Sequence, residues 1–122
     1  MKINELRAMY TTRELTSGTH EVLFEGIKYV LDETEDVKGV FVKVRGTDGT
    51  RYKDLYLALN KSTFYFERLL EQLKIESFDD NVINQSTGTA IKVNISRNYV
   101  DDRCFINADF DATKIAFNQQ YQ

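Results

Sequence analysis

Aromatic rings and cations alternate along one side of the segment VFVKVRGTDGTRYKDLYLAL, residues 40–59. Apart from Asp54, the side chains expected on that side are Phe41, Lys43, Arg45, Tyr52 and Tyr56. Aromatic rings stack on flat partners, and the side chains of Lys and Arg neutralise anions. The pattern therefore indicates a surface for noncovalent recognition and not a reaction centre.

A second group, of one ring and two cations, occurs in the segment RNYVDDR, residues 97–103, where two aspartates dilute the positive charge. The further candidate binding residues are Arg97, Tyr99 and Arg103 from this segment, with Lys38 and Arg51 near the ends of the first one. Together the two segments predict a track of positive charge interrupted by exposed rings.

The residues that usually perform catalysis lack partners in this sequence. His20 is the only histidine and Cys104 the only cysteine, which excludes an internal disulfide and every zinc pattern built from several cysteines. No glycine-rich phosphate loop, nucleophile elbow or pair of histidines at helical spacing occurs. The acids of residues 32–36 lack the spacing and glycine of a calcium loop. We expect no enzyme activity, no cofactor and no metal.

The strands that position the first group of rings are predicted from their turn. Asp48-Gly49, flanked by Thr47 and Thr50, is a strong signal for a two-residue type I′ hairpin turn. Such a turn would pair Val40 with Leu57 and Val42 with Leu55 on an inner face. On the outer face it would pair Phe41 with Tyr56, Lys43 with Asp54, and Arg45 with Tyr52.

The run HEVLFEGIKYVL, residues 20–31, predicts a long first strand that bends at a glycine. Val22 and Phe24 share one face before Gly26, and Ile27, Tyr29 and Leu31 take over that face afterwards. A bulge at a glycine resets the alternation in this way. We therefore expect a coiled strand that serves both halves of a closed barrel.

The rest of the chain predicts one helix and two more strands. Residues 62–75 place Phe66, Leu69, Leu70 and Leu73 at helical spacing, with Ser62 or Thr63 available as N-cap. We expect Phe64 and Tyr65, like Phe66, to lie in the core. Residues 76–89 are polar, and alternation returns in residues 89–96 and 104–110.

The order strand, strand, strand, helix, strand, strand predicts a mainly β protein. It is the order of a five-stranded OB-fold Greek-key barrel with one helix between strands 3 and 4. Another small barrel or an α+β sandwich would also fit. The expected organisation is an N-terminal arm or short helix over residues 1–17, a barrel domain over 18–110 and a C-terminal tail over 111–122.

The composition predicts one domain that folds alone. The chain has 122 residues and a formal net charge of −3, but the charges are segregated into an acidic stretch at 32–36 and a basic one at 38–53. The first residues lack the apolar run of a signal peptide, and no stretch approaches the roughly 18 apolar residues of a membrane span. We expect a cytoplasmic protein without a membrane partner, in which Cys104 packs inside as a small apolar group.

The outer face of the hairpin fits single-stranded nucleic acid. Each base stacks on an aromatic ring for roughly 1 to 3 kcal/mol, while cations neutralise the phosphates. Since every base has a flat face, such binding needs no particular sequence, and stacking does not separate RNA from DNA. Cross-strand pairs that only stabilise the sheet, or a protein interface such as an oligomer contact, are alternative roles for the same residues.

The chain resembles the small single-stranded DNA-binding proteins that phages of Gram-positive bacteria encode. The resemblance rests on the succession of the segments GTHEVLFEGI, KGVFVKVRGTDG, LYLALNKSTFYFERLLEQL, TGTAIKVNI and FINADF. The resemblance covers residues 18–110. It implies an OB barrel that coats single-stranded DNA during phage DNA replication or recombination in the host cytoplasm, as a homo-oligomer and beside a phage recombinase or annealing protein. The binding surface would map onto Phe41, Lys43, Arg45, Tyr52 and Tyr56, with Arg97 and Tyr99 added.

The end of the chain departs from the cellular relatives of that family. The sequence FNQQYQ has no acidic tip of the sort that recruits replication enzymes, so recruitment through the tail is not expected. The alternative function is that of an OB-like structural or adaptor module of a virion, which would bind protein through the same aromatic face.

Overall fold

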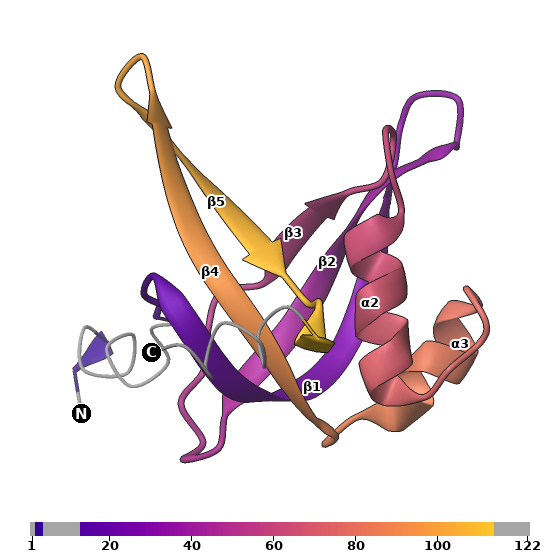
Figure 1. The fold of residues 1–122 in the computed structure, drawn as a ribbon, viewed down its shortest axis with the longest axis horizontal. Helices are drawn as coiled ribbons and strands as arrows, with labels where there is room; N and C mark the ends of the chain where they lie inside the picture. The colour runs from indigo at the N-terminus through magenta and orange to yellow at the C-terminus, as the bar shows by residue number, and fades with distance from the viewer. Residues whose placement is uncertain (1, 4–12, 114–122) are drawn as a thin grey trace.

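The computed structural model describes residues 2–3 and 13–113 of the chain. Its strands are β1 (Gly18–Leu31), β2 (Val37–Gly46), β3 (Leu55–Ala58), β4 (Ala90–Val100) and β5 (Arg103–Asp109). They form one antiparallel sheet in the order β3-β2-β1-β4-β5, so β3 and β5 are its two edges (Figure 1). The prediction of a mainly β fold with five strands is confirmed.

Strand β1 bends at Gly26, as predicted. Its first part pairs with β4 and its second part with β2. The register with β2 shifts between Phe24 and Gly26, and Gly26 has a φ of +124°, which favours glycine. The Ile27 N–H donates to Asn84 Oδ1 at 2.7 Å, so the backbone beside the bulge is hydrogen-bonded. Ile27 is buried as expected, whereas Leu31 is exposed because it lies beyond the core.

The turn between β2 and β3 differs from the predicted two-residue type I′ turn. The Gly46 N–H donates to the Thr50 carbonyl at 2.8 Å, which leaves residues 47–49 as the loop. A type I′ turn needs positive φ at both central residues, but only Gly49 has one, at +90°. The Asp48 carboxylate accepts a hydrogen bond from the Thr50 N–H at 3.0 Å, and this contact stabilises the longer loop.

The predicted register of the β2–β3 hairpin is confirmed away from this turn and is wrong near it. Three predicted pairs are confirmed: Val40–Leu57, Phe41–Tyr56 and Val42–Leu55. Two predicted pairs do not form: Lys43–Asp54 and Arg45–Tyr52. They fail because β3 begins only at Leu55 and because Arg45 faces Arg51 in an isolated bridge.

The segment before β1 pairs with the residues that precede β3. The Arg13 N–H donates to the Arg51 carbonyl at 3.0 Å, and the Lys53 N–H donates to the Arg13 carbonyl at 2.9 Å. Arg13 therefore bonds the backbone of residues 51–53, in which Arg51 also forms the isolated bridge to Arg45 of β2. Residues 1 and 4–12 of the arm or short helix predicted over residues 1–17 lie outside the described residues, as do residues 114–122 of the predicted tail.

Helix α2 (Phe64–Leu73) follows β3 and buries the four residues predicted for its inner face: Phe66, Leu69, Leu70 and Leu73. At its start the Phe64 N–H donates to Ser62 Oγ at 3.1 Å. At its end Lys74 adopts a left-handed conformation that stops the helix.

A short helix, α3 (Asp80–Ile83), and a 3₁₀ turn (Asn84–Ser86) lie in the segment expected only to be polar. The Asp79 carboxylate accepts a hydrogen bond from the Asn81 N–H at 2.9 Å and caps α3. Ile83 is fully buried. Ile83 is the only buried residue of α3, and one buried position gives no periodicity, so the sequence pattern could not indicate this element.

Strands β4 and β5 form a longer hairpin than predicted. Val100 pairs with Arg103, and both residues between them have positive φ, +49° at Asp101 and +65° at Asp102. These are the features of a two-residue type I′ turn, here without glycine. The prediction that Cys104 packs inside is wrong. Cys104 is exposed because this end of the hairpin extends past the core.

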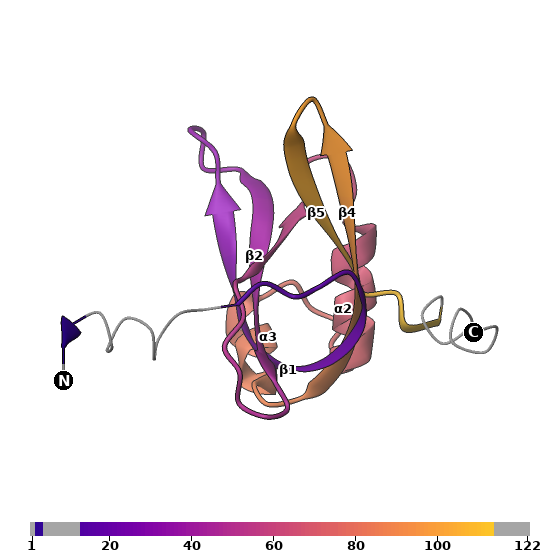
Figure 2. The same cartoon turned by 90° about the vertical axis from the view of Figure 1, so that its left-hand side faces the viewer.

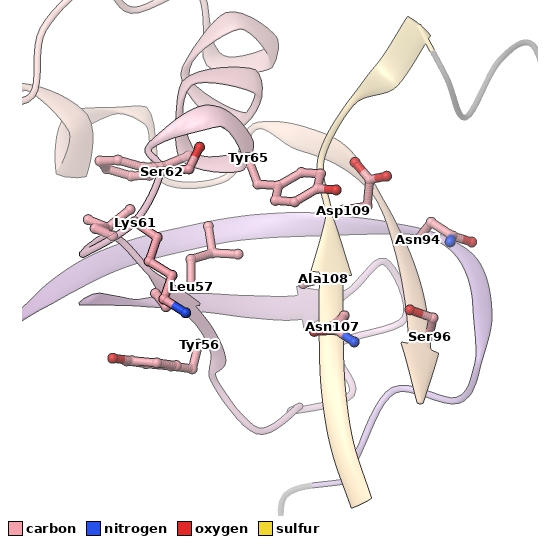
Figure 3. Close-up of a pocket in the computed structure, with 13 residues that line it drawn as sticks. Tyr56, Leu57, Lys61, Ser62, Tyr65, Asn94, Ser96, Asn107, Ala108 and Asp109 are labelled. Carbon is pink, nitrogen blue, oxygen red and sulfur yellow. The ribbon is translucent and has the colours of Figure 1, made fainter. Parts of the chain in front are cut away.

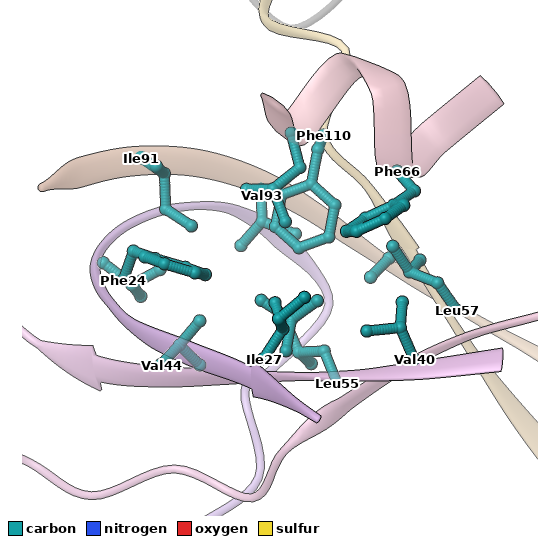
Figure 4. Close-up of a cluster of buried hydrophobic side chains, with 14 of the residues drawn as sticks. Phe24, Ile27, Val40, Val44, Leu55, Leu57, Phe66, Ile91, Val93 and Phe110 are labelled. Atoms are coloured by element: carbon teal, nitrogen blue, oxygen red, sulfur yellow. The ribbon is translucent and has the colours of Figure 1, made fainter. Parts of the chain in front are cut away.

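The core lies between the inner faces of the strands and α2 (Figure 4). Its largest fully buried side chains are Phe24, Phe66 and Phe110. Among the described residues, no helix is long and apolar enough to cross a membrane.

Candidate nucleic-acid interface

Two aromatic rings lie in contact on the outer face of β2 and β3. Phe41 and Tyr56 face each other across the ladder, with ring centroids 5.3 Å apart and ring planes inclined by 56°. Their neighbours along the strands, Val40, Val42 and Leu55, are buried, so alternation turns both rings outward. Phe41 is 37% exposed and Tyr56 is 43% exposed. We call these two residues the ring pair.

The position of the Tyr56 ring depends on a glycine in β2. Gly39 precedes Phe41 by two residues and therefore lies on the same face of the sheet. A Cβ atom at Gly39 would overlap the Tyr56 ring and its hydroxyl group. Glycine thus permits the ring to lie directly on the backbone of β2.

The predicted cations of the hairpin that joins β2 and β3 differ in their surroundings. Lys43 is exposed and has no ion pair or side-chain hydrogen bond with any described residue. Arg45 is also exposed, but its Nε lies 2.9 Å from the carboxylate of Glu25. Lys38 and Arg51, at the two ends of the hairpin, are both exposed. Of the predicted cations, Lys43 is the one best placed to bind an anion beside the ring pair, and the unpredicted Lys28 of β1 faces Phe41 across the ladder.

Tyr52 does not join the ring pair. It is half-buried and packs against the core, because it precedes β3 and pairs with Arg13. A Cβ atom at Gly46 would lie 3.1 Å from the Tyr52 ring, which shows how closely the ring approaches that backbone. The prediction that Tyr52 faces outward opposite Arg45 is therefore wrong.

The three candidate binding residues of the β4–β5 hairpin differ in their exposure to solvent. Tyr99 is 75% exposed and Arg103 is exposed, both near the tip. The Arg97 guanidinium instead donates hydrogen bonds to the Leu15 carbonyl at 2.6 Å and to Ser17 Oγ at 3.0 Å. Arg97 holds the segment before β1 in place and is largely shielded from solvent.

The tip of the β4–β5 hairpin and the β1–β2 loop project from the same side of the molecule (Figures 1 and 2). The β1–β2 loop is acidic, and the pKa of Asp32 within it lies below its ordinary value. The cause is hydrogen bonding from the Thr34 hydroxyl, then from the N–H groups of Asp36 and Thr34. The negative charge of this loop disfavours phosphates close to it.

Sequence reasoning missed two exposed rings at the start of α2. Phe64 and Tyr65, expected in the core, are 43% and 45% exposed, and their ring centroids are 5.3 Å apart. The Arg68 guanidinium lies 5.0 Å from the centre of the Phe64 ring. The helical spacing that buries Phe66 already turns its two predecessors away from the core, so the signal was present in the pattern.

A pocket of about 460 Å³ lies between the two edge strands and the start of α2 (Figure 3). Tyr56 of the ring pair and Tyr65 both line it. The pocket therefore continues the outer face of β3 toward β5. The described residues contain no group of three or more His, Cys, Asp or Glu side chains arranged to hold a metal ion.

No protein-family model matches the chain, and a search of curated proteins gives no significant match.

Proposed function

We propose that this protein binds single-stranded DNA on the outer face of β2 and β3, largely independently of sequence. The observation that carries the proposal is the ring pair, in which Phe41 and Tyr56 contact each other and remain exposed beside Lys43. Bases stack on such rings for about 1 to 3 kcal/mol each, and lysine neutralises the phosphates between them. Two rings would supply about 2 to 6 kcal/mol, to which the phosphate contacts add.

We further propose that the sheet is an OB-type barrel. In support, β1 pairs with both β2 and β4, and α2 lies between β3 and β4 in the chain. The edge strands β3 and β5 come together around one pocket, although they do not pair. In OB folds the face of strands 2 and 3 binds oligonucleotides, together with the loops that join strands 1 and 2 and strands 4 and 5. The resemblance to phage single-stranded DNA-binding proteins agrees with this proposal.

The predicted cations would contribute unequally. Lys43 is closest to the ring pair in the sequence of β2, and Tyr99 and Arg103 would continue the track on the β4–β5 hairpin. Arg45 and Arg97 already bind protein groups, so their contribution to DNA affinity would be small.

A mobility-shift experiment with labelled oligo-dT tests the proposal. Wild-type protein should shift the oligonucleotide, and Phe41→Ala and Tyr56→Ala should each weaken binding about tenfold, since each removes one stacked base. Phe64→Ala is the matched control, because Phe64 has the same exposed fraction as Tyr56 but lies on α2. The control should bind as the wild type does.

The dependence of affinity on salt and on competing nucleic acids shows which ligand the protein binds. Affinity should fall with salt concentration, and Lys43→Ala should reduce the slope of that fall by about 0.7, the value for one phosphate contact on a single strand. Competition by unlabelled DNA and by RNA of the same length decides between the two ligands, because stacking does not separate them. A wild-type protein that gives no shift would exclude the proposal and favour a protein-binding role for the ring pair.

A further inference from the structure

The pocket between β3 and β5 has one wall built from two polar cross-strand pairs. Ser96 of β4 faces Asn107 of β5, and one step along the ladder Asn94 faces Asp109. Residues two apart on a strand share a face, so all four side chains point to the same side of the hairpin. The four residues line the pocket (Figure 3).

The hydrogen-bonding groups of this wall retain capacity for a ligand. The side chains of Ser96 and Asn107 make no hydrogen bond with any residue that the structure describes. Asn94 uses its Oδ1 atom to accept a bond from Thr19, and Asp109 accepts one from the Asp111 N–H at 2.9 Å. Asp109 also has a further interaction, but a carboxylate offers about four acceptor positions, so it can accept from a ligand as well.

The opposite wall is aromatic and carries one cation. Tyr56 reaches the pocket from β3, and Tyr65 projects from α2 toward β5 (Figure 3). Lys61 lines the same pocket from the segment between β3 and α2. Rings on one side and amide, hydroxyl and carboxylate groups on the other match a planar heterocycle with a polar edge. The volume of about 460 Å³ lies within the range of small-ligand pockets, about 300 to 1,000 Å³.

We propose that this pocket takes one nucleobase with an exocyclic amino group, cytosine or adenine, from the bound single strand. The inference rests on the proposed function, because Tyr56 belongs both to the ring pair and to the pocket. A base stacked on Tyr56 has its neighbour placed at the pocket, with Lys61 available to its phosphate. Asp109 accepts a hydrogen bond from the amino group, as acidic side chains do from cytosine N4. Binding that is otherwise sequence-independent thereby gains a preference at one nucleotide.

A comparison of oligo-dC with oligo-dU of equal length measures the contribution of the amino group to affinity. Cytosine and uracil have the same ring size and differ at the position that bears the amino group. Fluorescence anisotropy should show that wild-type protein binds oligo-dC about fivefold to tenfold more tightly, the discrimination typical of one good contact to a base edge. Asp109→Asn should reduce this ratio toward one without weakening the binding of oligo-dU. Glu76→Gln removes the same charge from an exposed site outside the pocket and should keep the ratio.

A second variant tests the pocket independently, in case the first variant misfolds. Asn107→Ala, on an exposed strand position, should weaken both oligonucleotides equally if its amide binds the O2 atom that the two bases share. Equal wild-type affinity for oligo-dC and oligo-dU would overturn the pocket assignment and leave the proposed function standing. A ratio that persists in folded Asp109→Asn, or unchanged binding by Asn107→Ala, would also overturn it. Failure to bind either oligonucleotide would remove both proposals.

Discussion

The Tyr56 ring lies on the backbone of Gly39, on the strand that also carries its ring partner. Tyr56 stands opposite Phe41 in the ladder, and Gly39 is two residues from Phe41 on the same face. A side chain at position 39 would occupy the space of the Tyr56 ring. The geometry of the ring pair is therefore fixed by a residue that has no side chain.

Gly39→Ala should destabilise the protein, because the added methyl group overlaps the Tyr56 ring. We expect a loss of about 1 to 3 kcal/mol in the free energy of unfolding, the usual cost of overpacking. In the Tyr56→Ala background the overlap is absent, so the same substitution should cost much less. Urea unfolding of the four proteins of this double-mutant cycle measures the coupling. Equal costs in both backgrounds would show that the ring does not lie on Gly39.

We expect Arg97→Ala to lower the stability of the fold and Arg103→Ala to weaken DNA binding. Arg97 donates to the Leu15 carbonyl and Ser17, so its removal should lower the free energy of unfolding by about 1 to 3 kcal/mol, as expected for hydrogen bonds from a charged group. Arg103 is exposed, and its removal should instead weaken DNA binding and reduce its salt dependence. Thermal unfolding and anisotropy titrations of both variants give the two readouts. The reverse pattern would mean that Arg97 belongs to the interface after all.

The hydrogen bonds to Asp32 should keep the β1–β2 loop unchanged down to acidic pH. They lower the pKa of Asp32 in the folded state below its unfolded value of about 3.9. The stabilisation is therefore present above the unfolded pKa and is lost as the pH falls through the folded pKa. An NMR titration should show the Thr34 and Asp36 amide signals shifting only in that acidic range. Thr34→Ala should raise the pKa of Asp32, and an unchanged value would contradict the assigned cause.

The parts of the fold that the sequence predicts well are those with a sustained period. Alternation placed Val40 and Val42 inside, and helical spacing placed Phe66 inside, because burial of one face leaves a regular pattern. The turns were predicted less well. The type I′ conformation occurs at Asp101-Asp102 and not at Asp48-Gly49, since a backbone hydrogen bond to Thr50 and the Asp48 side chain stabilise a longer loop there.

The candidate site was predictable only where strands pair without interruption. The outward direction of Phe41 and Tyr56 follows from their register, which the structure confirms. Tyr52 was misplaced because its partner, Arg13, lies far away in the sequence. The hydrogen bond from Arg97 to the Leu15 carbonyl was missed for the same reason. Contacts between distant segments leave no local pattern, so only the structure reveals them.

A tryptophan placed in the ring pair tests most directly whether bases stack there. The chain contains no tryptophan, so Phe41→Trp and Tyr56→Trp each introduce a single fluorescent reporter. Phe64→Trp on α2 is the control. Titration with oligo-dT should quench the fluorescence of the first two variants saturably, at the concentrations that produce the mobility shift, and leave that of the control nearly unchanged. Binding without quenching at either position of the ring pair would contradict the account.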